Sequence, residues 1–130
     1  MNGCDEVLIS IRREGLFLVL HRSPWKKGYW HLAGGGVEDD ESDADAAARE
    51  LLEETGLEAP SLDDVGDDLG YDGVRVHGFA TDAPPDWEPV LNDEHDDYRW
   101  CALDDGLALL KWPEPREVLR RAAQLPEAAA

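Results

Sequence analysis

The chain has 130 residues, a length that fits one domain with its own hydrophobic core. Its 30 acidic residues outnumber 12 Lys and Arg, so the formal net charge is −18 at pH 7. Such a charge repels nucleic acids and anionic membranes, and it opposes a polyphosphate unless cations accompany the ligand. Five tryptophans and 42% hydrophobic residues argue against disorder. No apolar run is long enough to cross a membrane, and no signal-peptide pattern is present.

Cysteine usage and the charge balance favour a particular compartment. Cys4 and Cys101 are too few and too far apart for a disulfide framework, and they lack the spacing of a metal site. We interpret them as ordinary thiols in a reducing cytoplasm. The chain has 17 Asp and three Lys, and this excess of acidic residues is larger than one cation-binding site needs. Asp-rich, Lys-poor surfaces suit a cytoplasm of high salt, where screening reduces self-repulsion, so we predict a halophilic protein.

The N-terminal third has the pattern of three strands. Val7, Ile9 and Ile11 alternate with other residues and define one face of the first strand. A turn at Gly15 leads to a near-continuous apolar run, so we expect a hairpin whose second strand is covered on both faces. A loop with Pro24 and a short strand then lead to the glycines. The expected strands are 7–12, 16–22 and 29–33.

A helix is predicted for residues 42–56, with an N-cap at Ser42 and a left-handed Gly56 at its end. At about 100° per residue, three carboxylates share one arc, those of Glu50, Glu53 and Glu54. The opposite side is expected to pack on a sheet and carries Ala44, Ala48, Leu51 and Leu52. Clustered carboxylates repel one another, and a hard divalent cation that takes several oxygen ligands removes that cost.

The second half alternates strands and helices. A weak strand near 65–69 precedes a better one at 74–81, which has Val76 on one face and His77 and Phe79 on the other. The long loop 83–97 contains three prolines, and long loops in compact domains are often functional. A strand is expected at 98–103, a short helix capped by Asp104 at 104–110, and a last helix at about 115–125. This order favours a sheet sandwiched between helices.

Nine residues between positions 35 and 57 recur at a recognisable spacing: Gly35, Glu41, Arg49, Glu50, Leu51, Glu53, Glu54, Gly56 and Leu57. They fill every defined position of a pattern that resembles the Nudix box, Gly-x5-Glu-x7-Arg-Glu-U-x-Glu-Glu-x-Gly-U with U aliphatic. A merely solvated acidic helix would explain the glutamates but not the arginine and both glycines. One departure is Ala33, where the family usually has proline. The resemblance implies an α/β/α sandwich with a mixed sheet and a single Nudix hydrolase domain over residues 1–130.

The same resemblance implies the chemistry of the box. Its glutamates would bind Mg²⁺, with Mn²⁺ as a substitute, while water attacks phosphorus in a pyrophosphate bridge. Glu50 and Glu54 would be metal ligands, Glu53 a ligand or the residue that holds the water, and the Gly34 carbonyl a further ligand. Glu41 and Arg49 would fix the loop and the glutamates, so Arg49 counts with the catalytic set.

A second motif, Glu94-His95-x-x-Tyr98-x-Trp100, lies outside the box. It resembles the signature of a Nudix subgroup that cleaves nucleoside-triphosphate-like compounds, including dihydroneopterin triphosphate, or dinucleoside polyphosphates. There the glutamate approaches the metals as ligand or general base, so Glu94 is a candidate for both roles. The alternative is one more surface acid in an acidic loop. His95 alone is interpreted as a residue that hydrogen-bonds within the loop rather than as a ligand.

Substrate contacts are expected from the loop that precedes the box. Arg22 is a candidate to hold phosphate, with a surface ion pair as the equal alternative. Lys26 and Lys27 could also meet phosphate or belong to a mobile loop. The aromatic candidates to stack a base are Trp25, Tyr29 and Trp87, whereas packing is expected for Trp30, Trp100 and Trp112.

We therefore expect a cytoplasmic, Mg²⁺-dependent Nudix hydrolase, either monomer or homodimer. It would cleave a phosphoanhydride bond in a small nucleoside-triphosphate-like substrate, with no nucleic-acid or membrane partner. The alternatives are a dinucleoside polyphosphate hydrolase, a catalytically silent module that senses a nucleotide, and an acidic cation-binding protein without chemistry.

Overall fold

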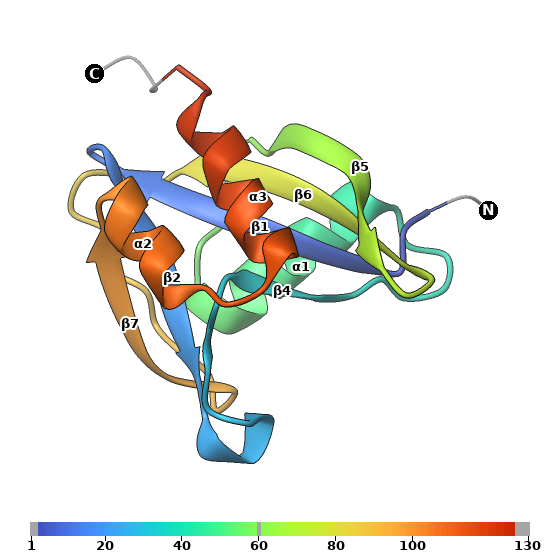
Figure 1. Cartoon of the computed structure of the whole chain (residues 1–130), viewed down its shortest axis with the longest axis horizontal. Helices are drawn as coiled ribbons and strands as arrows, with labels where there is room; N and C mark the ends of the chain where they lie inside the picture. Colours follow the sequence, from blue (N-terminus) through green and yellow to red (C-terminus); the bar gives the residue numbers. More distant parts are fainter. Residues whose placement is uncertain (1–2, 60, 127–130) are drawn as a thin grey trace.

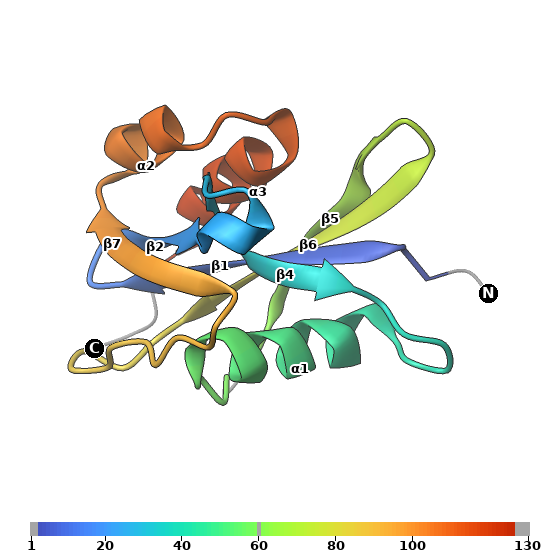
Figure 2. The same ribbon diagram turned by 90° about the horizontal axis from the view of Figure 1, so that it is seen from below.

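The computed structural model describes residues 3–59 and 61–126 and has three layers. Helix α1 (Asp43–Thr55) covers one face of a mixed sheet, and helices α2 (Leu103–Leu109) and α3 (Pro113–Ala123) cover the other, as Figure 2 shows. The predicted α/β/α sandwich is therefore confirmed. Among the described residues, no helix has both the length and the apolar character needed to cross a membrane.

Strand β1 lies at the centre of the sheet (Figure 1). The path through the sheet is β3-β2-β1-β6-β5, while β4 also pairs with β1 and β7 with β2. The β1–β6 pairing is parallel and the other pairings are antiparallel, including the predicted β1–β2 hairpin. The strands are β1 (Glu6–Arg13), β2 (Leu16–Arg22), β3 (Trp30–His31), β4 (Ala33–Gly36), β5 (Asp63–Tyr71), β6 (Val74–Asp82) and β7 (His95–Cys101).

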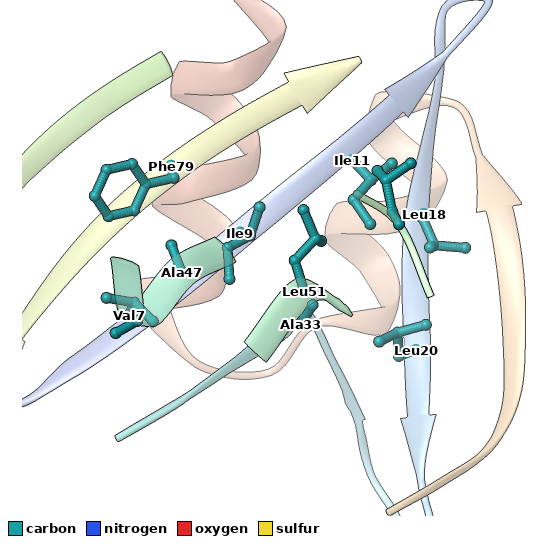
Figure 3. Close-up of a cluster of buried hydrophobic side chains, with 11 residues drawn as sticks. Val7, Ile9, Ile11, Leu18, Leu20, Ala33, Ala47, Leu51 and Phe79 are labelled. Atoms are coloured by element: carbon teal, nitrogen blue, oxygen red, sulfur yellow. The ribbon is translucent and has the colours of Figure 1, made fainter. Parts of the chain in front are cut away.

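Two hydrophobic clusters fill the spaces between the layers. The alternation of β1 places Val7 and Ile9 in the cluster under α1, whereas Leu8 joins the cluster under α2 and α3. Figure 3 shows the first cluster, in which Leu51 of α1 packs with residues of β1, β2, β4 and β6. Each large aliphatic side chain buried in this way stabilises the fold by about 1.5–3 kcal/mol. The hydrophobic core therefore consists of two clusters, one on each face of the sheet.

The predicted ends of α1 are confirmed, because Ser42 caps its start and Gly56 ends it at φ 80°. The Ser42 hydroxyl accepts a hydrogen bond from the Asp45 N–H at 3.1 Å. The predicted apolar face is wrong for all but Leu51, since the other three residues are exposed: Ala44, Ala48 and Leu52. The face that packs on the sheet instead carries Ala46, Ala47, Glu50, Leu51, Glu54 and Thr55. Two glutamates therefore lie in the middle of the buried face, against the usual rule that charges lie outside.

Several other boundaries differ from the prediction. The expected strand at 29–33 is divided into β3 and β4, and the glycines are part of β4 because they pair with β1. Strand β5 is longer than expected, because pairing with β6 holds an acidic segment of low strand propensity. Strand β7 begins at His95 rather than Tyr98, and a short 3-10 helix, η1 (Pro24–Lys26), occupies the expected loop. Asp104 lies in the first turn of α2, whose N-cap is Ala102.

Candidate active site

A cleft of about 430 Å³ lies between the glycines of β4, the inner face of α1 and the segments that flank β2 and β7. Two kinds of charge line it. One group of carboxylates comes from α1 and from the residue just before β7, and a smaller cationic group comes from the end of β2 and from η1. The charged residues of the lining are Glu6, Arg22, Lys26, Glu50, Glu54 and Glu94.

Glu50 and Glu54 form the floor of the cleft, one helical turn apart. They are only 9% and 2% exposed. The Gly34 N–H donates to Glu54 Oε1 at 3.0 Å, which ties the helix to β4. A Cβ at Gly35 would overlap the Glu50 carboxylate, so the box glycine is needed for this close packing. Helix and glycine strand together fix the position of both carboxylates.

Burial controls the electrostatics of this floor. It raises the pKa of Glu54, although the Gly34 N–H opposes the shift, and the neighbouring Glu50 and Glu94 carboxylates raise it further. Burial also raises the pKa of Glu50, against the lowering effect of Arg49. Two adjacent carboxylates that are hard to ionise together form a pair that a divalent cation would stabilise. Glu50 and Glu54 offer only oxygen ligands, which fits a hard ion such as Mg²⁺.

Arg49 connects the floor with the loop before the helix. Its Nη1 donates to Glu50 Oε1 at 2.7 Å, and its Nε and Nη2 donate to the Glu41 carboxylate at 2.8 and 3.0 Å. Nη2 also donates to the Gly36 carbonyl at 3.0 Å. The hydrogen bonds from Arg49 lower the pKa of Glu41 to about 2. Arg49 therefore positions Glu50 from outside the cleft, since it is not among the lining residues.

Glu53 does not join the other two box glutamates. Its side chain is 53% exposed and meets Arg49 Nη1 at 3.5 Å, and it does not line the cleft. The expectation that three carboxylates converge is therefore corrected to two. The reason is the direction of each side chain around the helix axis. Glu50 and Glu54 point toward the sheet, whereas Glu53 lies at the edge of the same arc and is directed toward solvent.

Glu94 faces the same cleft from the segment before β7. Its carboxylate is 3.3 Å from Lys26 Nζ, and its charge contributes to the raised pKa of Glu54. Two backbone contacts hold it, because its N–H donates to Asn92 Oδ1 at 3.1 Å and its carbonyl accepts from Ser23 N at 2.9 Å. The structure thus brings together Glu50, Glu54, Glu94 and Gly34, four of the five predicted metal-site residues.

Arg22 and Lys26 form a cationic wall beside this acidic floor. Arg22 Nε donates to the Lys26 carbonyl at 3.1 Å, and its guanidinium lies 5.0 Å from the centroid of the Tyr29 ring. Tyr29 lines the cleft and meets Trp112 edge to face, with the ring centroids 4.5 Å apart. Trp25 stands next to the wall, 63% exposed, with Lys26 Nζ 5.4 Å from its ring centroid.

Two of the other candidates lie away from the cleft. Trp87 packs, partly buried, against the cluster under α1 and meets Trp100 edge to face, and it does not line the cleft. Lys27 does not line the cleft, and it adopts a left-handed backbone at φ 79° after η1. Among the described residues, the cationic wall thus consists of one arginine and one lysine.

Several lining residues were given no site role from the sequence, and His95 was expected to hydrogen-bond within its loop. His95 is 7% exposed, burial lowers its pKa to about 4, and among the described residues its Nδ1 has no hydrogen-bond partner. Burial likewise lowers the pKa of His31, which lines the cleft from β3. Glu6 and Tyr71 enter from β1 and β5. Only His95 had a sequence signal, its place in the Glu94 motif, because the other three are brought in by strand pairing.

Comparison with known proteins places this fold and site in a family. The NUDIX domain family matches residues 5–122, so the chain belongs to the Nudix family. It is 33% identical over 110 residues to the CTP pyrophosphohydrolase of Escherichia coli (strain K12), covering 82% of each chain. A solved structure of a MutT protein from Methanosarcina mazei Go1 is 32% identical and has a TM-score of 0.72, covering 92% of this chain and 91% of that one.

A further relative is similar over only part of its length. The octanoyltransferase of Myxococcus xanthus is 38% identical over 116 residues, which are 84% of this chain but only 32% of that protein. Together the comparisons confirm the predicted family, the α/β fold and the enzyme class, a hydrolase of acid anhydrides.

Proposed function

We propose that the chain is a Mg²⁺-dependent pyrophosphohydrolase that cleaves a phosphoanhydride bond in a nucleoside-triphosphate-like substrate. The observation that carries the proposal is the buried pair Glu50 and Glu54, held under Gly34 and Gly35 at the floor of a cleft. Burying two carboxylates side by side costs stability, and the cost is explained if they bind a cation. The named pyrophosphohydrolase among its relatives supports the same reaction class.

Each residue of the floor has a distinct part in the proposal. Glu50, Glu54 and the Gly34 carbonyl would hold the ion, and Arg49 fixes the Glu50 carboxylate. When bound, Mg²⁺ neutralises phosphate oxygens and makes water a stronger nucleophile, and Mn²⁺ can replace it because it accepts the same oxygen ligands. Glu53 is proposed to act through Arg49, because its side chain lies outside the cleft.

Glu94 is proposed as the general base. It faces the floor and accepts a proton from the attacking water while a new P–O bond forms and the bridging P–O bond breaks. Its carboxylate lies 3.3 Å from Lys26 Nζ, where the acidic floor meets the cationic wall. The alternative, that Glu94 is a further metal ligand, uses the same position.

The cationic wall supports a substrate with several phosphates. Arg22 and Lys26 are proposed to hold the phosphates farther from the ion, and Tyr29 and Trp25 to contact the base at the rim. A dinucleoside polyphosphate is the second candidate substrate, favoured by the motif that runs from Glu94 to Trp100. It would need the exposed Trp25 to meet the second nucleoside.

A substrate panel tests the proposal. The purified chain is incubated with Mg²⁺ and, separately, nucleoside triphosphates, dinucleoside polyphosphates and inorganic polyphosphate, and the products are separated and identified. We expect release of pyrophosphate and a nucleoside monophosphate, and loss of turnover on chelation of the metal. If the chain binds nucleotides without turnover, it is the catalytically silent sensing module. If it binds cations but no nucleotide, it is an acidic cation-binding protein.

The surface charge supports a second proposal, adaptation to high salt. A net charge of −18 on 130 residues produces self-repulsion that salt screens. Unfolding as salt is removed by dialysis is the expected result, and full stability in dilute buffer contradicts it. A single domain over residues 1–130, a cytoplasmic location and a monomeric or homodimeric state stay predictions.

A further inference from the structure

Outside the cleft, three potential metal ligands of different chemistry meet at the other end of α1. Cys4 precedes β1, Asp43 is the first residue of α1, and His77 belongs to β6. One ligand atom from each lies within 4.8 Å of the other two. The parallel pairing of β1 with β6 sets Val7 beside His77, which brings the segment before β1 close to β6. The fold therefore gathers a sulfur, an oxygen and a nitrogen donor from three separate segments.

Asp43 and His77 are held in place rather than free to move with solvent. The Cys4 N–H donates to both carboxylate oxygens of Asp43, at 3.0 and 3.1 Å. His77 Nδ1 lies 2.8 Å from Asp43 Oδ2, and its ring stacks on Phe79 with a centroid separation of 4.3 Å. The side chains of Asp43 and His77 are only 13% and 12% exposed. Such fixed, shielded donors are the usual setting of a structural metal ion.

The thiol of Cys4 lacks a good partner among the described residues. Cys4 Sγ is buried and lies 4.0 Å from the Asp67 carbonyl, a long contact for a hydrogen bond. His77 Nε2 is also buried and lies 2.9 Å from Asp64 Oδ2, a carboxylate that can accept its proton. Buried polar groups are normally satisfied, so the weak contact of the Cys4 thiol calls for an explanation. A metal ion bound by Sγ and by His77 Nδ1 would account for it, with the ring proton on Nε2 beside Asp64.

We propose that Cys4, Asp43 and His77 form a second metal site, distinct from the box, for a borderline-soft divalent ion such as Zn²⁺. The ligands are Cys4 Sγ, an Asp43 carboxylate oxygen and His77 Nδ1, with water as the fourth. A thiolate and an imidazole select zinc over Mg²⁺, which prefers six oxygen ligands. The two sites of the chain therefore differ in the hardness of their donors.

Binding follows a simple proton balance. The Cys4 S–H bond breaks, its proton goes to solvent, and the thiolate binds the ion. The hydrogen bond from Nδ1 to Asp43 also breaks, and both atoms then bind the ion. In a neutral imidazole the Nδ1 proton moves to Nε2 beside Asp64, and in a charged imidazole it goes to solvent while Nε2 keeps its own proton. Ligand atoms around a tetrahedral zinc lie about 3.3–3.6 Å apart, so shifts of about 1 Å suffice from the present arrangement. Asp64 is 62% exposed, which leaves an entry path from solvent.

The ion would have a structural role and would take no part in catalysis. It would join the N-terminal segment, the first turn of α1 and the central sheet, and it would stabilise the folded chain in proportion to its concentration above the dissociation constant. Because Asp43 is the first residue of α1, which carries Glu50 and Glu54, the bound ion would also fix the position of the first turn of that helix. The inference rests on Cys4, Asp43 and His77 and does not depend on the proposed function.

The test uses the full chain in excess Mg²⁺, so that the box is occupied by the harder ion. Zinc binding is measured by equilibrium dialysis with metal analysis, and Co²⁺ serves as a spectroscopic probe of the thiolate. We expect one Zn²⁺ per chain, a thiolate-to-cobalt charge-transfer band, and a rise in the thermal midpoint on adding Zn²⁺. Cys4→Ser should abolish the band and weaken zinc binding by at least about 100-fold, since losing even an outer partner costs about 10- to 100-fold.

Cys101→Ser is the matched control, because Cys101 is also buried but belongs to the cluster under α2 and α3. It should retain the cobalt band and the zinc-induced rise. His77→Gln provides a second variant if Cys4→Ser does not fold, with circular dichroism to check folding in each case. The proposal is overturned if the band survives Cys4→Ser, if Cys101→Ser removes it, or if His77→Gln binds zinc like the unmodified chain. Loss of zinc binding in Glu54→Gln alone would place the ion in the box and also overturn it.

Discussion

The floor and the wall of the cleft are built in different ways. The acidic floor, Glu50 and Glu54, is buried on a helix and held by a backbone N–H and by Arg49. The cationic wall, Arg22 and Lys26, lies at a strand end and in a short 3-10 helix, with partners that a ligand can replace. The floor is thus preorganised for one ion, whereas the wall can adapt to different phosphate chains.

The floor and the wall also differ in how much their charges cost the stability of the folded protein. The floor carries like charges in a poorly hydrated place, which is unfavourable until a cation binds. The wall carries opposite charges near solvent, where the Lys26–Glu94 contact contributes little to stability. Mutations in the floor should therefore change catalysis far more than folding. Mutations in the wall should change substrate affinity.

The largest expected effect comes from breaking the floor. Glu54→Gln should lower kcat by at least about 100-fold, because it removes a metal ligand. Its stability without metal should equal or exceed that of the unmodified chain, since Gln cannot ionise beside the buried Glu50 carboxylate and can still accept the Gly34 hydrogen bond. Turnover assays and chemical denaturation measure the two quantities. Glu53→Gln is the matched control and should lose much less activity, and equal losses would mean that Glu53 reaches the ion.

The second largest effect is expected from Glu94, which lies between the acidic floor and the cationic wall. Glu94→Gln should lower kcat on the order of 100-fold with little change in KM, because a general base acts in the transition state. Steady-state kinetics across pH measures both constants. Asp93→Asn is the control, because its side chain does not line the cleft. An unchanged kcat in Glu94→Gln would assign the proton transfer to another group.

A smaller effect is expected from the wall itself. Lys26→Gln should raise KM about tenfold at nearly constant kcat, because a hydrogen bond to a charged group contributes about 1.5–3 kcal/mol and this one is partly exposed. The salt dependence of KM should also decrease. Lys27→Gln controls for charge alone, since Lys27 is adjacent but does not line the cleft. A similar rise in both variants would indicate only long-range attraction.

The smallest effect concerns the support of the floor. Glu41 has a pKa lowered from 4.5 to about 2 by its hydrogen bonds with Arg49, so its ion pair stabilises the fold above pH 4.5. That stabilisation is lost as pH falls through about 2. Glu41→Gln should therefore be less stable than the unmodified chain at neutral pH, and the difference should shrink on acidification. Denaturation at stepped pH measures this, with Glu38→Gln as control because Glu38 is 70% exposed.

Local signals were enough to predict much of this molecule. The alternation of Val7, Ile9 and Ile11, the caps Ser42 and Gly56, and the spacing of the box depend on neighbouring residues, and the structure agrees with them. The buried face of α1 could not be predicted by polarity. Its alanines allow close approach to the sheet, and its two central glutamates are buried because the cleft lies there.

Tertiary placement explains the remaining differences. Trp87 and Trp25 look equally suited to stack a base, but Trp87 packs against the core cluster beside Trp100, whereas Trp25 is exposed. Cys4 lacked the sequence spacing of a metal ligand, because its neighbours Asp43 and His77 arrive from positions 39 and 73 residues away. Spacing patterns detect ligands within one segment and miss those that the sheet assembles.

The parallel pairing of β1 with β6 sets the order in which the chain can fold. Val7 and His77 are neighbours in space yet 70 residues apart in the chain. During synthesis β2 and β4 are available to pair with β1 first, and β6 becomes available only after more than half of the chain has been made. Contacts of such long range slow folding and leave an apolar strand edge uncovered in the meantime. We therefore expect the pairing of β1 with β6 to be a late step in the folding of the chain.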